Sequence, residues 1–166
     1  MKVMDEKDRI LLQVLEDNAR ISLHDVAAMT QLSEAEVEER IQVLEKAKII
    51  RKFTTVIDWE RAGDGEVSAI IDLKVTPERD YGYDRIAERI ARFRQVKSLR
   101  LMSGVYDLQL HVTAKTMHDV ARFVSEQIAP IDHIRETATH IIMKTYKENG
   151  NLFYEREEGE RLPLSF

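Results

Sequence analysis

The sequence predicts an α+β protein in two parts: an N-terminal winged helix-turn-helix, then a ferredoxin-like βαββαβ domain. Apolar residues recur at helical spacing in the first part and alternate with a period of two, typical of strands, in the second. A stretch rich in glycine and charge separates the two patterns. We expect the helix-turn-helix domain over 1–58, a linker over 59–65, the ferredoxin-like domain over 66–148 and a C-terminal tail over 149–166.

Three short amphipathic helices are expected in the first part. The first covers residues 5–16, and the next two each start after a serine, Ser22 and Ser33, that is followed three residues later by an acid. A serine at this position can accept a hydrogen bond from a free backbone N–H, and a carboxylate in the first turn favours the helix dipole. The β-branched run over 49–57 predicts a strand or wing after the third helix.

The second part predicts the element order β-α-β-β-α-β. Strands are expected over 67–75, 96–102, 106–112 and 131–146, and helices over 83–93 and 117–128. Right-handed crossovers fold such a chain into an antiparallel sheet with both helices on one face. The other face, expected to bear Ile70, Arg100, Met102 and Ile141, is not wholly polar and therefore predicts an association surface.

Composition narrows the class of protein. The chain has 166 residues and no cysteine, which excludes a disulfide framework and thiolate metal sites and suits a reducing cytoplasm. We see no signal peptide, and the longest apolar runs fall far short of the ~20 residues of a membrane span. The five histidines show no metal-binding spacing, and no nucleophile elbow or phosphate-binding loop is present. We therefore expect a cytoplasmic protein with no catalytic residues, metal, cofactor or membrane contact.

The order and spacing of several segments give the chain a resemblance to the Lrp/AsnC family of feast/famine regulators. The segments are MDEKDRILLQVLEDNARIS, LSEAEVEERIQVLEKAKIIRKFTTVID and SGVYDLQLHV. The resemblance implies a transcription regulator whose third short helix, the second of the helix-turn-helix pair, binds double-stranded DNA. It also implies that the ferredoxin-like domain binds an effector and forms a homo-oligomer, a dimer or an octamer. The residues expected to contact DNA are Arg20, Ser22, Ser33, Glu36, Arg40, Lys46, Arg51 and Lys52.

The G-x-Y-D-L motif that begins at Gly104 is the predicted ligand site. A glycine turn exposes backbone N–H groups that can hold a carboxylate, and Asp107 offers a partner for an ammonium group, as a free amino acid requires. The family resemblance adds a T-x-T pattern near the same site. The expected ligand residues are Met102, Ser103, Gly104, Val105, Tyr106, Asp107, Thr137 and Thr139. The alternative is an ordinary hairpin turn that needs glycine for a positive φ, with β-branched strand residues nearby.

Charge conflicts with the DNA-binding prediction. Residues 1–60 carry nine Lys or Arg and thirteen Asp or Glu, which leaves a net charge of −4, and the expected recognition helix holds Glu34, Glu36, Glu38 and Glu39. Because phosphate contacts supply most non-specific DNA affinity, an acidic helix-turn-helix domain should bind DNA weakly. Three explanations stay open: the basic residues cluster on one face, a glutamate accepts from a cytosine amino group, or the helix-turn-helix binds no DNA.

The third explanation points to an enzyme. Relatives of the Lrp/AsnC family include paired-domain proteins that decarboxylate a tetrapyrrole of the sirohaem type and bind no DNA. Such a decarboxylase on the same two-domain scaffold is our alternative function. The chain shows no added cluster of histidine and arginine to support it, and the G-x-Y-D-L turn suits a sensor better.

Overall fold

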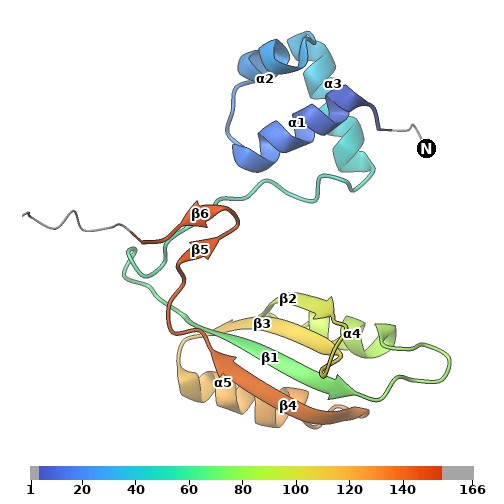
Figure 1. The fold of residues 1–166 in the computed structure, drawn as a ribbon, viewed down its shortest axis with the longest axis vertical. Helices are drawn as coiled ribbons and strands as arrows, with labels where there is room; N and C mark the ends of the chain where they lie inside the picture. The colour runs from blue at the N-terminus through green and yellow to red at the C-terminus, as the bar shows by residue number, and fades with distance from the viewer. Residues whose placement is uncertain (1–3, 155–166) are drawn as a thin grey trace, which may run out of the picture. The chain divides into compact units, whose positions relative to one another are not determined.

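The computed structural model describes residues 4–154, which divide between Ile57 and Asp58 into two compact units (Figure 1). The first unit holds three helices: α1 (Glu6–Asp17), α2 (Leu23–Thr30) and α3 (Glu34–Lys46). Their apolar faces meet in one small core of Leu11, Val26, Ala27, Val37 and Leu44. The prediction of three short helices that share a core is therefore confirmed.

Each of these helices begins with a side-chain cap. The Ser22 and Ser33 side chains accept hydrogen bonds from backbone N–H groups three residues later, as the sequence predicts, and Asp5 does the same for α1. Between α2 and α3, Gln31 adopts a left-handed conformation with φ of 55°. This residue ends α2 and allows the tight turn of a helix-turn-helix.

The prediction of a strand or wing over 49–57 is wrong, because residues 51–58 form neither helix nor strand. After α3, Lys48 takes a positive φ of 57° and the N–H of Ile49 bonds back to the Leu44 carbonyl at 2.9 Å. The apolar side chains of Phe53 and Val56 are exposed. A β-branched run becomes a strand only where a neighbouring strand supplies its hydrogen bonds, and the first unit provides none.

The second unit is a four-stranded antiparallel sheet with helices on one face (Figure 1). The strands are β1 (Val67–Val75), β2 (Val96–Leu101), β3 (Leu108–Ala114) and β4 (Ile134–Ile141), in the spatial order β2-β3-β1-β4. The helices are α4 (Asp84–Ala91) and α5 (Met117–Phe123), and α5 continues into the π-helical turn η1 (Val124–Ile128). The predicted βαββαβ order is confirmed, although β4 is shorter than the expected 131–146.

Alternate residues of β1 fix the two faces of the sheet. Ala69, Ile71, Leu73 and Val75 are buried against the helices. Ile70 and Arg100 lie on the open face, as expected, because they are opposite His111 and Gln109. Ile141 does not, because it is opposite Ala69 and packs against the helix-side core. Its predicted place on the open face is therefore wrong.

A small hairpin follows the sheet. It consists of β5 (Lys147–Glu148) and β6 (Asn151–Leu152), and its turn is made by Asn149 and Gly150, both with positive φ. The expected tail over 149–166 thus starts inside a hairpin, and its residues from 155 onward lie outside the described part of the chain. Within residues 4–154, no helix is long and apolar enough to cross a membrane.

Candidate DNA-binding surface and ligand-binding turn

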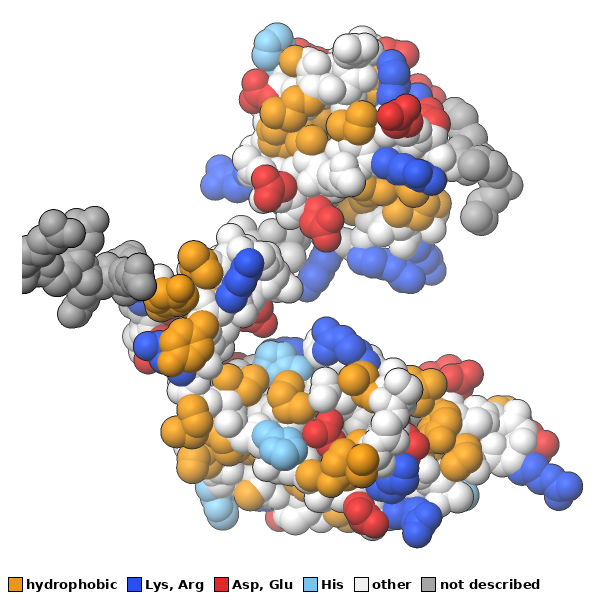
Figure 2. Space-filling model, viewed as in Figure 1, with side chains coloured by type: hydrophobic (Ala, Val, Ile, Leu, Met, Phe, Trp, Pro, Cys, Tyr) orange, Lys and Arg blue, Asp and Glu red, His pale blue; other side chains and the backbone are white. Residues whose placement is uncertain are grey.

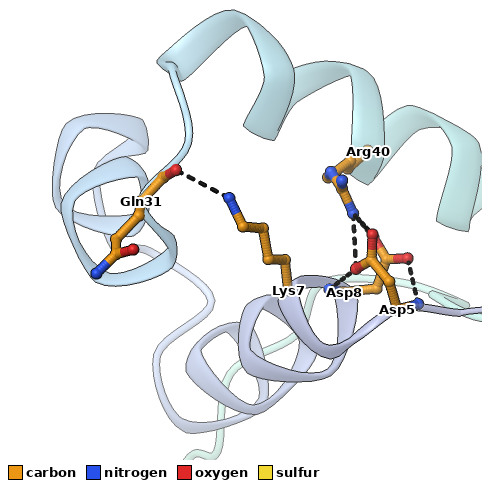
Figure 3. Close-up of polar contacts among 5 residues, drawn as sticks. All are labelled: Asp5, Lys7, Asp8, Gln31 and Arg40. Carbon is orange, nitrogen blue, oxygen red and sulfur yellow. Dashed lines mark hydrogen bonds and ion pairs between the residues drawn. The ribbon is translucent and has the colours of Figure 1, made fainter.

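Arg40 lies on α3 and points toward the start of α1, where two carboxylates hold its guanidinium (Figure 3). Its Nη1 atom donates to Asp5 Oδ2 at 2.8 Å and to Asp8 Oδ1 at 2.6 Å. These contacts hold the pKa of the Asp5 carboxyl below its ordinary value and raise the pKa of Arg40. Arg40, expected to contact DNA, is therefore engaged within its own unit.

A second tie joins the same two regions. Lys7, on α1, donates from Nζ to the carbonyl oxygen of Gln31 at 3.0 Å, in the turn between α2 and α3 (Figure 3). The first turn of α1 thus contacts both the turn and the middle of α3. These charge-assisted bonds set how α3 lies on the three-helix core.

Two of the five glutamates of α3 also have partners in the unit. Glu36 accepts from the Ser33 backbone N–H at 2.9 Å, and this bond lowers the pKa of its carboxyl. Glu34 Oε1 lies 3.1 Å from His24 Nδ1, on α2. Glu36 therefore completes a capping box and carries a structural role, whereas Glu38 and Glu39 are exposed.

The remaining residues expected to contact DNA divide by location. Ser22 and Ser33 cap their helices, while Arg20, Lys46, Arg51 and Lys52 are exposed. The last three lie with Lys48 at and just after the C-terminal end of α3, so four cations fall within seven residues. The acidic first unit therefore has a basic segment, residues 46–52, at the C-terminal end of α3, which is the second helix of the helix-turn-helix.

The G-x-Y-D-L motif forms the connection between β2 and β3. Gly104 has a φ of 142°, a conformation that side chains with a Cβ rarely adopt. The Met102 N–H donates to the Asp107 carbonyl at 2.8 Å, which closes the turn, and Lys74 Nζ donates to the Val105 carbonyl at 2.6 Å. The exposed tip therefore has a fixed shape and presents the apolar side chains of Met102 and Val105 to solvent.

Asp107 is held by three donors. Its Oδ2 accepts from the Val75 backbone N–H at 2.8 Å and lies 3.3 Å from Lys74 Nζ, and its Oδ1 accepts from the Tyr83 hydroxyl at 3.3 Å. The Val75 bond is the main cause that lowers the pKa of Asp107. Sequence reasoning missed Lys74 and Tyr83, which lie 33 and 24 residues away along the chain.

Thr137 and Thr139 lie on β4, at the opposite edge of the sheet from the turn. Thr137 is opposite Leu73, Leu73 is opposite Leu108, and Leu108 is opposite Leu101 at the end of β2. Three strand spacings of about 4.8 Å separate the two edges, or roughly 14 Å. The end of β2 is therefore far from the two threonines, although Asp107 lies nearer to them, because its N–H donates to the Leu73 carbonyl on β1 at 2.9 Å.

Metal binding gains no support from the structure. No group of three or more His, Cys, Asp or Glu side chains in residues 4–154 is placed to hold a metal ion. The turn and the basic segment instead offer backbone donors, apolar surface and cations. These features suit an organic effector at the turn and phosphates at the basic segment.

A helix-turn-helix joined to a ferredoxin-like sensing domain defines a class, the two-domain transcription regulators. Family models place the chain within it: residues 4–45 match the AsnC-type helix-turn-helix domain, and residues 68–152 match the Lrp/AsnC ligand binding domain. The chain belongs to the Lrp/AsnC family. It is a transcription regulator with a DNA-binding helix-turn-helix and a ligand-binding domain.

Relatives with similar sequences match most of the length of this chain. The chain is 42% identical over 163 residues to the uncharacterized HTH-type transcriptional regulator YugG of Bacillus subtilis, and the match covers 98% of each protein. It is 30% identical over 145 residues to the HTH-type transcriptional regulator LrpA of Pyrococcus abyssi, covering 87% of this chain and 100% of LrpA. Both relatives are named as regulators, so the decarboxylase alternative gains no support.

Solved structures show the same fold. E. coli AsnC superposes with a TM-score of 0.68 at 20% identity, covering 88% of this chain and 96% of AsnC. The transcriptional regulator NMB0573 of Neisseria meningitidis, solved as a complex with L-Met, gives a TM-score of 0.70 at 22% identity, covering 88% of this chain and 94% of that one. At these identities the likeness establishes the fold.

Proposed function

We propose that this regulator is a cytoplasmic homo-oligomer that binds a free amino acid between two copies of its ligand-binding domain and thereby changes its DNA affinity. The observation that carries the proposal is the separation of the turn from the threonine pair on opposite edges of one sheet. We infer that the site combines the turn of one copy with β4 of another. The L-Met bound to NMB0573, a protein of the same fold, supports an amino acid as the effector class.

Within this site, the turn supplies two kinds of contact. Its tip offers backbone N–H groups for a carboxylate and the exposed side chains of Met102 and Val105 for an apolar side chain. Asp107 fixes the shape of the tip through its bonds to Val75, Lys74 and Tyr83. We therefore assign Asp107 a positioning role in place of the direct ammonium contact that the sequence suggests.

The open face of the sheet is proposed to pair two copies into a dimer. Thr137 and Thr139 are opposite Leu73 and Ile71 and so lie on the helix side, which puts the proposed ligand site at a second contact, between copies of different dimers. The open face mixes apolar, histidine and charged side chains, as the lower unit in Figure 2 shows. Ile70 is half-buried, and His140 Nε2 lies 3.4 Å from Asp72 Oδ2. His111 Nε2 is buried without a hydrogen-bond partner in the described part of the chain. A buried polar atom without a partner is costly, and a second sheet packed on this face can supply one.

Oligomerisation is tested by light scattering on the purified chain. We expect a mass of at least twice the 19.3 kDa of one chain, and larger dimer multiples at higher concentration. Asp72→Lys on the open face should lower the mass, whereas Asp80→Lys, in an exposed loop, should leave it unchanged. A 19.3 kDa particle at tens of micromolar would contradict the proposal.

The two-copy site is tested with a pair of variants, one on each side. We first expect a screen of free amino acids to raise the melting temperature of the wild type for at least one of them. Val105→Glu on the turn and Thr139→Glu on β4 each change an exposed residue and should each abolish that shift. Mixed and reassembled, the two variants should regain part of it, because some interfaces then combine an intact turn with an intact β4.

Two results would contradict this proposal. If no amino acid stabilises the wild type, the proposed effector class is wrong. If the mixture of variants stays unresponsive although each variant alone forms oligomers, the site does not need two copies. Lys97→Glu, an exposed change on β2, serves as the control and should respond as the wild type does.

A further inference from the structure

We propose that α3 reads DNA bases through Glu39 and Gln42, and that the operator therefore requires a C·G pair next to an A·T pair. The proposal rests on the DNA-binding function of the helix-turn-helix and adds the identity of the base contacts. It concerns the acidic residues that make this recognition helix unusual.

Three polar side chains of α3 are already engaged within the first unit. Glu34 pairs with His24, Glu36 bonds to Ser33, and Arg40 is held by two carboxylates of the α1 start. The apolar residues Val37, Ile41 and Leu44 pack in the three-helix core. These residues cannot reach a base edge without breaking the contacts that shape the unit.

The residues of α3 on the side away from the core form one stripe, which Glu38 and Glu45 flank. Ala35, Glu39, Gln42 and Lys46 follow one another at spacings of four, three and four residues, so they lie along one side of the helix. All four are exposed, on the side away from Val37 and Leu44. The side chains of Glu39 and Gln42 make no hydrogen bond or ion pair within the described residues. The stripe is therefore the surface that a major groove would meet.

The chemistry of Glu39 selects one base. An ionised carboxylate only accepts hydrogen bonds, and in the major groove cytosine presents an N4 amino donor. Guanine presents two acceptors and thymine one acceptor and a methyl group, so both are unfavourable partners. Adenine has an N6 amino donor, but the N7 acceptor beside it repels a carboxylate. The Gln42 amide both donates and accepts, as adenine N7 and N6 require. One turn of helix separates the two side chains, which suits contacts to neighbouring base pairs.

The basic segment after α3 offsets the repulsion between Glu39 and the DNA backbone. Lys46 ends the stripe, and Lys48, Arg51 and Lys52 follow it, all exposed. Phosphate contacts by these cations supply affinity and carry no sequence information. The expected result is a protein with weak non-specific binding that loses much of its affinity when the required cytosine is replaced.

The test is selection of binding sites from random DNA duplexes by the full-length protein, followed by affinity measurements at one fixed salt concentration. We expect a conserved C·G pair in each half-site, and a loss of about tenfold in affinity when it becomes T·A. Glu39→Gln should remove this discrimination and admit adenine at the same position. Glu16→Gln on α1 makes the same charge change away from the stripe and should keep the wild-type preference.

The outcomes separate this inference from the function it rests on. If the protein retards no DNA at low salt, the proposed DNA contacts of α3 fail together with the operator prediction. If it binds DNA but the selected sites lack a conserved cytosine, only the base-reading proposal is wrong. The same holds if Glu39→Gln keeps the preference of the wild type. A cytosine preference lost in Glu39→Gln and kept in Glu16→Gln supports the proposal.

Discussion

Each unit contains a cluster of charged side chains built around one residue that the sequence predicts to bind DNA or a ligand. In each cluster this residue joins two elements of the fold. In the first unit, Arg40 joins α3 to the start of α1 through Asp5 and Asp8. In the second, Asp107 joins the β2–β3 turn to Val75 at the end of β1 and to Lys74 and Tyr83. The first cluster is open to solvent at one of its two acids, because the Asp5 side chain is 47% exposed, whereas those of Asp8 and Asp107 are each 16% exposed.

The two clusters show how a charged residue of a predicted site can be assigned either to structure or to binding. A charged side chain with several partners in its own unit fixes a shape, and one without partners is available for DNA or an effector. Burial then decides how much each cluster contributes, because solvent screens exposed ion pairs. The following changes test that ranking, from the largest expected effect to the smallest.

Asp107→Ala should give the largest loss of stability. It leaves the Val75 N–H without an acceptor at a half-buried position, which costs about 1–2 kcal/mol after solvent screening. Chemical unfolding at pH 7 measures the change, with Asp80→Ala in the exposed loop after β1 as the control. A loss for Asp107→Ala no larger than for Asp80→Ala would break the comparison between the clusters.

Arg40→Ala should destabilise the first unit by a smaller amount than Asp107→Ala destabilises the second. It removes the cation shared by Asp5 and Asp8, and the more exposed of these acids gains hydration in its place. The helical signal in thermal unfolding reports the change. Arg9→Ala, an exposed change on α1, should have little effect. Equal effects of the two arginine changes would show that the ion pairs of Arg40 do not stabilise the first unit.

Acid should weaken both clusters. The pKa values of Asp5 and Asp107 are lower in the folded chain than their ordinary values, so the unfolded chain takes up protons first as the pH falls. The stability these groups provide is present above the ordinary carboxyl range and is lost as the pH falls through the folded-state pKa values. Unfolding measured between pH 7 and about pH 3 should be less pH-dependent for Asp107→Asn than for the wild type.

Glu36→Gln should have the smallest effect. A glutamine at this position can still accept from the Ser33 N–H, so the capping box survives and only the charge is lost. The helical melting transition should move less than in Arg40→Ala. Ser33→Ala, which removes the other half of the box, should move it further than Glu36→Gln does. The reverse order would show that the charge of Glu36 matters more than the cap.

Periodicity and cap residues predicted most of the fold. The serine caps and the βαββαβ order follow from local signals that a single segment carries. The strand over 49–57 failed because pairing depends on a neighbour that the segment does not encode. Ile141 was placed on the wrong face because strand register depends on which residues are opposite each other, here Ile141 and Ala69.

The sites were predicted less completely than the fold. Sequence patterns located the turn and the basic residues after α3, but not the partners of Arg40, which lie 32 and 35 residues earlier. A signal for them was present, because Asp5 and Asp8 are three residues apart at the start of one helix and so face the same side. Lys74 and Tyr83 gave no such signal, since their meeting with Asp107 depends on sheet order.

The most direct test of this account is the salt dependence of DNA binding, because each phosphate contact contributes about one unit to its slope. The measurement compares wild type, Arg40→Gln and Lys46→Gln on the same operator, at a temperature where all three are folded. We predict that Lys46→Gln lowers the slope by about one unit and that Arg40→Gln leaves it unchanged. A slope that falls for Arg40→Gln and not for Lys46→Gln would contradict the assignment of the paired arginine to structure and the unpaired lysine to DNA.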